Sequence, residues 1–366
     1  MTPSMKYLNT ILLGDAVEQL KEVPSGIVQT CVTSPPYFGL RDYHVEDQIG
    51  LEDTPTEYIT RLVQVFQEVH RVLRPDGTLW LNLGDSYFGG GYSNHRINGE
   101  RWLDEHGGDR RRTRQADRIR ANPDLKPKDL LGIPWRVAFA LQAAGWWLRA
   151  DIIWAKGSCL PESVTDRPTR SHEYVFLLTK SPTYFYDQVA IREPLAHTNE
   201  QRTTATYTTT HYGARNGGNG GLDALAARMR NGDHTSRNKR SVWHINPRPF
   251  PGAHFAVMPP ELARLCILAG SGEGCCSACR MPYQRADGGW RPSCLCEVET
   301  APCLVLDPFA GSGTTLAVAK SLRRDYLGVE LNPKYVELAR ERLAPIEEEV
   351  EQQTFLAEVY PTLPQD

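Results

Sequence analysis

Two short strings of this 366-residue chain carry the residue types from which a chemical site could be built. Residues 32–37 read VTSPPY, and residues 307–315 read DPFAGSGTT. In the first string, the Ser34 hydroxyl and a carbonyl of the rigid Pro-Pro turn can accept hydrogen bonds, and the Tyr37 ring can stack on a planar group. An exocyclic amine on an aromatic base donates two protons, so the string predicts a holder for such an amine.

The second string follows a short apolar strand at 303–306 and precedes a predicted helix at 314–322. A strand, a glycine turn and a helix bring backbone close to a ligand because glycine has no Cβ. The next predicted strand, 326–329, ends in Glu330, whose carboxylate can accept hydrogen bonds from ribose hydroxyls. The dinucleotide spacing GxGxxG and a phosphate-binding lysine are missing, which favours a nucleoside cofactor over nicotinamide or ATP. On this string alone, a tight turn without a ligand is the alternative.

Alternating strands and helices must position the two strings. The periodicity predicts further strands at 11–13, 27–33, 78–83, 147–154 and 173–179, and further helices at 16–23, 58–73, 130–144 and 333–353. Such alternation predicts a parallel-rich α/β sheet with helices on both faces. Ligands bind beyond the carboxyl ends of such strands. We therefore expect one shared site for the residues that follow strand ends, namely Asp15, Ser34, Asp85 and Glu330.

The composition is that of a globular protein, with 40% hydrophobic and 23% charged residues and a formal net charge of −3. This charge argues against a whole-protein affinity for nucleic acid but is compatible with a local basic face. No apolar run of about 18 residues is present. The N-terminus also lacks the pattern of a signal peptide. We therefore expect a cytoplasmic protein without a membrane span.

Taken together, the two strings resemble the motifs of amino-group DNA methyltransferases. Residues 33–37 (TSPPY) are similar to the catalytic motif of that family, and residues 307–313 (DPFAGSG) to its S-adenosylmethionine motif. The catalytic motif comes first, as in the β class of the family. The resemblance covers about residues 8–340 apart from two loops and a cysteine segment. It implies a Rossmann-like, S-adenosylmethionine-dependent methyltransferase sheet with circularly permuted motif order, in an enzyme encoded by a prokaryote or a phage.

The resemblance also implies roles for single residues. The catalytic residues would be Ser34, Pro35, Pro36 and Tyr37. The cofactor contacts would come from Asp15, Thr33, Phe255, Asp307, Phe309, Gly311, Gly313, Thr314, Glu330 and Asn332. Residues 154–156 (WAK) and 170–173 (RSHE) look like the family's motifs on the side of the target base.

The amine of a base is a poor nucleophile because its lone pair is delocalised into the ring. Acceptors at Ser34 can draw the nitrogen toward tetrahedral geometry, so positioning and hydrogen bonding would do most of the catalysis. The base must leave the duplex to reach such a pocket. In the family, Ser rather than Asp before Pro-Pro-Tyr is typical of cytosine-N4 enzymes, so the resemblance favours cytosine N4 in double-stranded DNA. Adenine N6 is the alternative, a catalytically dead, zinc-containing DNA-binding regulator is a remote one, and RNA or protein amides are weaker still.

Six of the nine cysteines lie between residues 275 and 303. In a chain expected to be cytoplasmic, such clustering favours metal over disulfides. Two close pairs, Cys276 with Cys279 and Cys294 with Cys296, offer four thiolates for a tetrahedral structural zinc. Other interpretations stay open: Cys275 and Cys303 are alternative ligands, and the segment could be a reduced loop with free thiols.

Two long segments, 87–128 and 196–240, lack hydrophobic periodicity and contain clusters of arginine. Loops of this length in a compact domain are usually functional or disordered. We expect DNA contacts from Arg111, Arg112, Arg114, Arg237 and Arg240, with solvated loop charge as the alternative.

These observations predict one methyltransferase domain with insertions. Its catalytic half spans 1–86 and 129–195, its cofactor-binding half spans 241–273 and 301–350, and the remainder is a DNA-contacting loop (87–128), a target-recognition region (196–240), a zinc knuckle (274–300) and a C-terminal tail (351–366). The expected partner is double-stranded DNA. A cognate restriction endonuclease would be a functional partner that need not bind, and the sequence is compatible with a monomer or a homodimer.

Overall fold

We describe the chain from a computed structural model. It describes residues 5–43, 45–88, 96–97, 100–101, 125–159, 161–194, 236–247, 257–286 and 289–359. The chain divides into two compact units, one made of Met1–Tyr186 with Ser241–Asp366, and the other of Asp187–Arg240.

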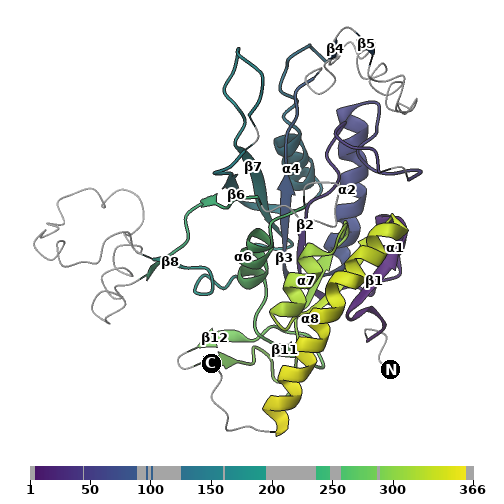
Figure 1. The fold of residues 1–366 in the computed structure, drawn as a ribbon. Helices are drawn as coiled ribbons and strands as arrows, with labels where there is room; N and C mark the ends of the chain where they lie inside the picture. Colours follow the sequence, from purple (N-terminus) through teal and green to yellow (C-terminus); the bar gives the residue numbers. More distant parts are fainter. Residues whose placement is uncertain are drawn as a thin grey trace, which may run out of the picture. The chain divides into compact units, whose positions relative to one another are not determined.

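The first unit is built on an eight-stranded sheet (Figure 1). In spatial order its strands are β1 (Thr10–Leu13), β16 (Asp325–Glu330), β15 (Leu304–Asp307), β2 (Val28–Thr33), β3 (Leu73–Leu83), β7 (His172–Thr179), β6 (Trp147–Ala155) and β10 (Val242–His244). Strand β7 is antiparallel to both of its neighbours, and every other pair in this sheet is parallel. The predicted parallel-rich α/β sheet is confirmed, with one reversed strand that the sequence did not predict.

Helices cover both faces of this sheet. They are α1 (Ala16–Lys21), α2 (Pro55–Val72), α4 (Ile133–Ala143), α6 (Pro260–Gly270), α7 (Thr314–Ser321) and α8 (Pro333–Val359), with a 3-10 turn at Met5–Tyr7. Helices α6, α7 and α8 contact one another in series, and so do α1, α2 and α4. Figure 1 shows α6, α7 and α8 together on one face of the sheet, with α2 and α4 on the other.

Helix α2 shows why the elements form where they do. Thr54 Oγ1 accepts a hydrogen bond from Glu57 N at 3.1 Å, and the Glu57 carboxylate accepts one from Thr54 N at 3.1 Å. This reciprocal capping satisfies two backbone donors that the helix start would otherwise leave unpaired. The helix then buries an apolar face that includes Leu62, Phe66 and Val69, and each such side chain contributes roughly 1.5–3 kcal/mol of burial free energy.

Several predicted boundaries differ from the structure. Strand β3 begins at Leu73, so the predicted turn at 75–77 lies inside it, and its pairing with β2 shifts register between Val28 and Thr30. This irregularity accommodates the turn residues without ending the strand. Helix α6 was not predicted, and α8 continues to Val359 rather than ending near 353.

The predicted loop insertion at 87–128 is closed at its base. Phe88 N donates to Asp129 O at 2.8 Å, and Lys128 N donates to Phe88 O at 2.9 Å. Within the insertion, the structure describes the short pair β4 (Arg96–Ile97) and β5 (Glu100–Arg101). Residues 89–95, 98–99 and 102–124 lie outside the described residues.

The second unit contains β8 (Glu193–Pro194), which pairs antiparallel with β9 (Ser236–Arg237). Most of the predicted target-recognition region, 195–235, and the end of the predicted tail, 360–366, lie outside the described residues. Among the helices that the structure describes, none combines the length and the apolar character needed to cross a bilayer.

Candidate active site

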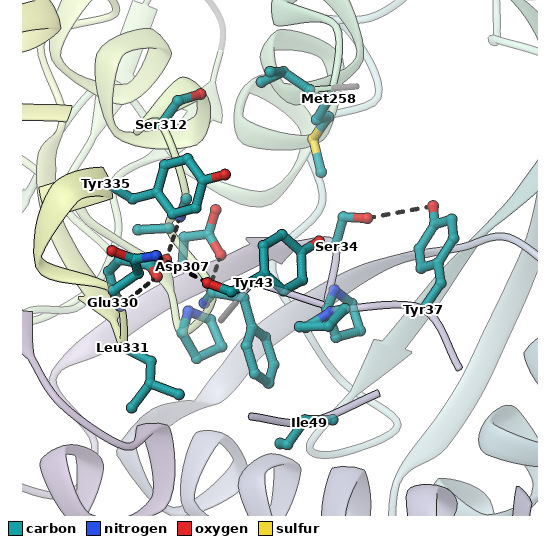
Figure 2. Close-up of a pocket in the computed structure, with 18 of the residues that line it drawn as sticks. Ser34, Tyr37, Tyr43, Ile49, Met258, Asp307, Ser312, Glu330, Leu331 and Tyr335 are labelled. Carbon is teal, nitrogen blue, oxygen red and sulfur yellow. Dashed lines mark hydrogen bonds between the residues drawn. The ribbon is translucent and has the colours of Figure 1, made fainter. Parts of the chain in front are cut away.

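A cavity of about 400 Å³ opens at the carboxyl edge of the sheet, where β15 and β2 are neighbours. The chain leaves β15 toward β16 on one side and leaves β2 toward β3 on the other. Open α/β sheets bind ligands at such a switch point. Both predicted strings line the cavity, through Ser34–Tyr37 and through residues 307–312 with 314–315. Figure 2 shows Ser34 and Asp307 in this cavity, carried by different strands.

A buried hydrogen bond joins the two strings directly. Thr33 Oγ1 donates to Asp307 Oδ1 at 2.6 Å, although the residues are 274 positions apart in the chain. Phe309 N donates to the same carboxylate oxygen at 3.1 Å. Burial nevertheless raises the pKa of Asp307 to about 6, because desolvation outweighs these bonds. Asp307 and Phe309 line the cavity, whereas Thr33 is buried and is not among the lining residues.

The two glycines of the turn, Gly311 and Gly313, have different functions. Gly311 lines the cavity with φ +50, and its N–H donates to Glu330 Oε2 at 2.8 Å. Gly313 precedes α7 with φ +75, and a Cβ there would lie 2.8 Å from Ala339 Cβ. Gly313 therefore permits close packing of α7 against α8 and is not among the lining residues, whereas Thr314 is.

Glu330 ends β16 on the cofactor-string side of the cavity. Its Oε1 accepts from Asn332 N at 2.8 Å, and burial raises its pKa. The rings of Tyr43 and Tyr335 meet edge to face with centroids 6.3 Å apart, and both line the cavity, as does Asn332. Figure 2 shows both rings near Glu330. The two tyrosines were missed from the sequence because neither lies in a recognisable motif.

Of the carboxylates predicted to share this site, Asp15 does and Asp85 does not. Asp15 lines the cavity and caps α1, where its Oδ1 accepts from Val17 N at 2.9 Å and Glu18 N at 3.1 Å. Asp85 Oδ1 instead accepts from Ser86 N and from Ile133 N, both at 3.0 Å. The Asp85 prediction was wrong because its side chain turns back to cap the start of α4.

The aromatic ring of the catalytic string, Tyr37, is held by a hydrogen bond to a residue outside the string. Tyr37 Oη donates to Glu173 Oε2 at 2.6 Å, and Ser34 Oγ donates to Tyr37 Oη at 3.4 Å, as the dashed line in Figure 2 shows. Burial raises the pKa of Tyr37 well above its usual value, and the charge of Glu173 adds to the shift. The Pro36 carbonyl accepts from Tyr58 Oη at 2.8 Å, which fixes the Pro-Pro turn on α2.

Glu173 reaches this edge because β7 is reversed. The second residue of β7 lies opposite Trp154, near the carboxyl end of β6. Its Oε2 accepts from Asn82 Nδ2 at 3.1 Å, and its Oε1 forms an ion pair with Lys156 Nζ. Glu173, Asn82 and Lys156 all line the cavity. The sequence alone marks 154–156 and 170–173 only as segments, because a network spread over three strands has no local signature.

The cysteine segment attaches to the sheet at its amino edge. Sγ atoms of Cys276, Cys279, Cys294 and Cys296 all lie within 4.8 Å of one another. Cys276 Sγ accepts from Cys279 N at 3.4 Å. Two short antiparallel strand pairs frame the group, β11 (Cys275–Cys276) with β14 (Thr300–Ala301) and β12 (Gln284–Ala286) with β13 (Gly289–Arg291). At the start of β3, Arg74 Nη1 donates to Cys279 O at 2.8 Å.

The two alternative ligands lie outside this four-thiol group. Cys275 Sγ donates to Pro302 O at 3.3 Å, and Cys303 is buried at the entry to β15. Among the residues that the structure describes, the four-thiol group is the one candidate metal site.

The predicted DNA contacts are described only in part. In the second unit, Arg237 Nε and Arg240 Nε both bind Glu193 Oε1, at 2.8 and 2.6 Å, and the Arg240 side chain is 68% exposed. Arg111, Arg112 and Arg114, together with the cofactor candidate Phe255, lie outside the described residues.

Comparisons with known proteins agree with this geometry. A family model described as DNA methylase, of the N6/N4 type, matches residues 28–341. The chain is 44% identical over 339 residues to Type II methyltransferase M.XycI of Xanthomonas campestris pv. cyanopsidis, covering 92% of this chain and 87% of that protein. It is 43% identical over 334 residues to Type II methyltransferase M.SmaI of Serratia marcescens, covering 91% and 90%. PvuII DNA methyltransferase (cytosine-N4-specific) shares the fold, with a TM-score of 0.53 at 17% identity over 93% of this chain and 92% of that one.

Proposed function

The chain belongs to the N6/N4 DNA methylase family, and on that premise we propose that it methylates the exocyclic N4 amine of cytosine in double-stranded DNA, with S-adenosylmethionine as the methyl donor. One observation carries the proposal. Ser34, at the end of β2, and the turn from Asp307 to Ser312 border one cavity, and the Thr33–Asp307 bond ties them together. An amine at the first string and a methyl donor at the second would therefore lie side by side.

The residues on the β15 side suit S-adenosylmethionine. The cofactor carries an adenine, a ribose diol and two cationic groups, and the cavity offers an aromatic or acidic counterpart to each. Tyr43, Tyr335 and Phe309 provide ring faces, while Asp15, Asp307 and Glu330 provide carboxylates. We assign Glu330 to the ribose hydroxyls, and Asp15 and Asp307 to polar or cationic groups. We assign Thr33, Gly313 and Asn332 to shaping the β15 side of the cavity, without a direct part in the chemistry.

The residues on the β2 side suit the target base. We propose that Ser34 Oγ and a carbonyl of the Pro-Pro turn accept hydrogen bonds from the base amine, and that Tyr37 packs against the ring. This holds the amine with its lone pair directed at the methyl group, which the bound cofactor supplies as an electrophilic carbon. Because the base must enter a cavity at the sheet edge, it has to be flipped out of the duplex.

Cytosine is preferred to adenine N6 because position 34 is Ser and not Asp. The test is nucleoside mass spectrometry of DNA treated with the protein and labelled S-adenosylmethionine. We expect N4-methylcytosine as the product. If N6-methyladenine is the sole product, the target is adenine and the cytosine assignment is wrong. A protein that binds no S-adenosylmethionine in calorimetry would instead support a catalytically dead DNA-binding regulator.

The remaining assignments belong to the same proposal. The catalytic motif before the cofactor motif corresponds to the circularly permuted β class. We propose that the loop at 87–128 and the region at 196–240 contact DNA, using the arginines at 111, 112, 114, 237 and 240. A cognate restriction endonuclease would act on the same DNA without needing to bind this chain, which we propose acts as a monomer or a homodimer.

We also propose that the four-thiol group binds a structural zinc. A tetrahedral site with Zn–S bonds of about 2.3 Å requires sulfur atoms roughly 3.8 Å apart, and the four Sγ atoms lie within 4.8 Å of one another. All four ligands come from the protein, which is typical of a closed structural site. Since the segment joins the amino edge of the sheet, opposite the cavity, we assign the zinc to fold stability and not to methyl transfer.

A further inference from the structure

We propose that the hydrogen-bonded series Ser34–Tyr37–Glu173 removes the proton that the base amine must lose on methylation, with the Glu173 carboxylate as its terminal acceptor. This inference rests on the proposed function, because it concerns the amine that Ser34 would hold. The string that would hold the amine, residues 32–37, supplies no base of its own: a serine hydroxyl, backbone carbonyls and a phenol are all weak proton acceptors at neutral pH.

The geometry of the series is directional. Ser34 Oγ donates to Tyr37 Oη at 3.4 Å, and Tyr37 Oη donates to Glu173 Oε2 at 2.6 Å. The Tyr37 hydroxyl has a second acceptor in Asn82 Oδ1, but that contact is longer, at 3.3 Å. Since Tyr37 has one hydroxyl proton, the shorter contact directs it to Glu173. The Ser34–Tyr37 contact is at the long end of hydrogen bonding and would tighten when a base occupies the cavity.

Glu173 is held so that one oxygen receives the proton while the other keeps its counter-ion. Oε2 accepts from Tyr37 and from Asn82 Nδ2, and Oε1 pairs with Lys156 Nζ. The side chains of Glu173 and Lys156 are 14% and 22% exposed, so the acceptor borders water through its ion-pair side. A proton delivered from inside the cavity can therefore leave toward solvent.

The step balances without any further reactant. As the amine nitrogen bonds to the methyl carbon, the bond from that carbon to the donor's sulfur breaks and its electron pair stays on sulfur. The nitrogen now carries one proton too many. That proton passes to Ser34 Oγ, the Ser34 proton passes to Tyr37 Oη, and the Tyr37 proton passes to Glu173 Oε2. Ser34 and Tyr37 end neutral, and the carboxylic acid of Glu173 then releases its proton to water.

Two substitutions interrupt the series while preserving its shape. Glu173→Gln keeps an acceptor oxygen for Tyr37 but cannot take up a proton at neutral pH. Tyr37→Phe keeps the ring and removes the relay hydroxyl. The chain offers a matched control in Tyr326, whose Oη donates to Glu347 Oε1 at 2.8 Å outside the lining of the cavity. Tyr326→Phe and Glu347→Gln make the same chemical changes to a tyrosine–glutamate pair that the relay does not use.

The experiment measures single-turnover methyl transfer, together with S-adenosylmethionine affinity by calorimetry. We expect each relay variant to slow transfer by about 100-fold or more, a size typical of a lost proton-transfer group. The double variant should be no slower than the slower single variant, because both interrupt one path. Cofactor affinity should stay within about twofold of wild type, and the control variants should transfer at the wild-type rate.

A readout that needs no turnover comes from NMR of tyrosine labelled at Cζ. Tyr37 Oη donates to Glu173 Oε2 at 2.6 Å, so Glu173→Gln should shift the signal that disappears in Tyr37→Phe. A shifted signal with wild-type transfer in Glu173→Gln would overturn the relay, because the contact would then exist without carrying a proton. A wild-type protein that yields N6-methyladenine would overturn the cytosine assignment alone, since the relay serves either amine. A folded protein that methylates no base would overturn both.

Discussion

Gly84 sets the position of the Tyr37 ring, and Gly84→Ala tests whether that position controls methyl transfer. A Cβ at residue 84 would lie 2.5 Å from Tyr37 Cε2, 3.0 Å from Cδ2 and 3.2 Å from Cζ. Carbon atoms in contact are about 3.5–4.0 Å apart, so the ring would have to retreat by about 1 Å. The hydroxyl would move with it, and the 2.6 Å bond to Glu173 would be lost.

A misplacement of about 1 Å at a reacting centre can cost on the order of 100-fold in rate. We therefore expect Gly84→Ala to lower single-turnover methyl transfer by roughly 30- to 100-fold, which corresponds to about 2–3 kcal/mol of transition-state stabilisation. S-adenosylmethionine affinity, measured by calorimetry, should change little because Gly84 lies on the base side of the cavity.

Gly26→Ala is the control for general destabilisation. Gly26 has φ +71, and no atom lies within 4 Å of the position that a Cβ would take, so an alanine there adds backbone strain without a clash. Such strain costs roughly 1–2 kcal/mol, which should lower the melting temperature and leave transfer by the folded protein unchanged. Wild-type transfer in Gly84→Ala, or an equal loss of cofactor affinity, would refute the reasoning.

Other perturbations separate the parts of the site. Ser34→Ala should slow transfer by about 100-fold or more while calorimetry still detects S-adenosylmethionine, and an equal loss of binding would make Ser34 structural. The pKa of Asp307 is raised to about 6, and a cationic ligand favours the ionised carboxylate, so cofactor affinity should rise with pH up to about 6 and level off above it. Below that pH the affinity should fall by up to about tenfold per pH unit, and Asp307→Asn should abolish this pH dependence of cofactor affinity. Removing zinc, by chelation or by Cys276→Ser with Cys279→Ser, should lower the melting temperature by several degrees without changing transfer by the protein that stays folded; a preparation with no bound zinc by metal analysis and an unchanged melting curve would contradict the metal proposal.

The sequence predicted the parts of the fold that local patterns specify. Helix α2 was predicted because its apolar residues recur at helical spacing, and β2 because a continuous buried run ends at a Pro-Pro turn. The glycine turn at Gly311 was predicted because positive φ and a strand-to-helix transition are both local properties. The Pro-Pro turn after β2 and the glycine turn after β15 both line the cavity, through Ser34–Tyr37 and through residues 307–312.

The direction of a strand is not a local property. His172–Thr179 has the same apolar composition whether it runs parallel or antiparallel. The family resemblance assigned residues 170–173 to the side of the target base, but nothing in the segment predicted that Glu173 would contact Tyr37. The prediction that Asp85 shares the cavity was wrong for a related reason. A carboxylate after a strand can face a ligand or cap the next helix, and the choice depends on Ile133, which is 48 residues away.

The reversed strand also explains why Tyr37 needs contacts from outside its own motif. The Pro-Pro turn fixes the backbone through Tyr58, but the ring is fixed by Gly84 beneath it and by Glu173 at its hydroxyl. In a fully parallel sheet, the residues at this edge would all be strand ends, and a carboxylate there would precede a loop whose conformation varies. Glu173, the second residue of β7, instead pairs with Trp154 of β6, and the next residue, Tyr174, pairs with Leu83 of β3. The acceptor therefore lies within the β6–β7 ladder and not in a loop, which gives the Ser34–Tyr37–Glu173 series an anchored end against which the base amine can be positioned.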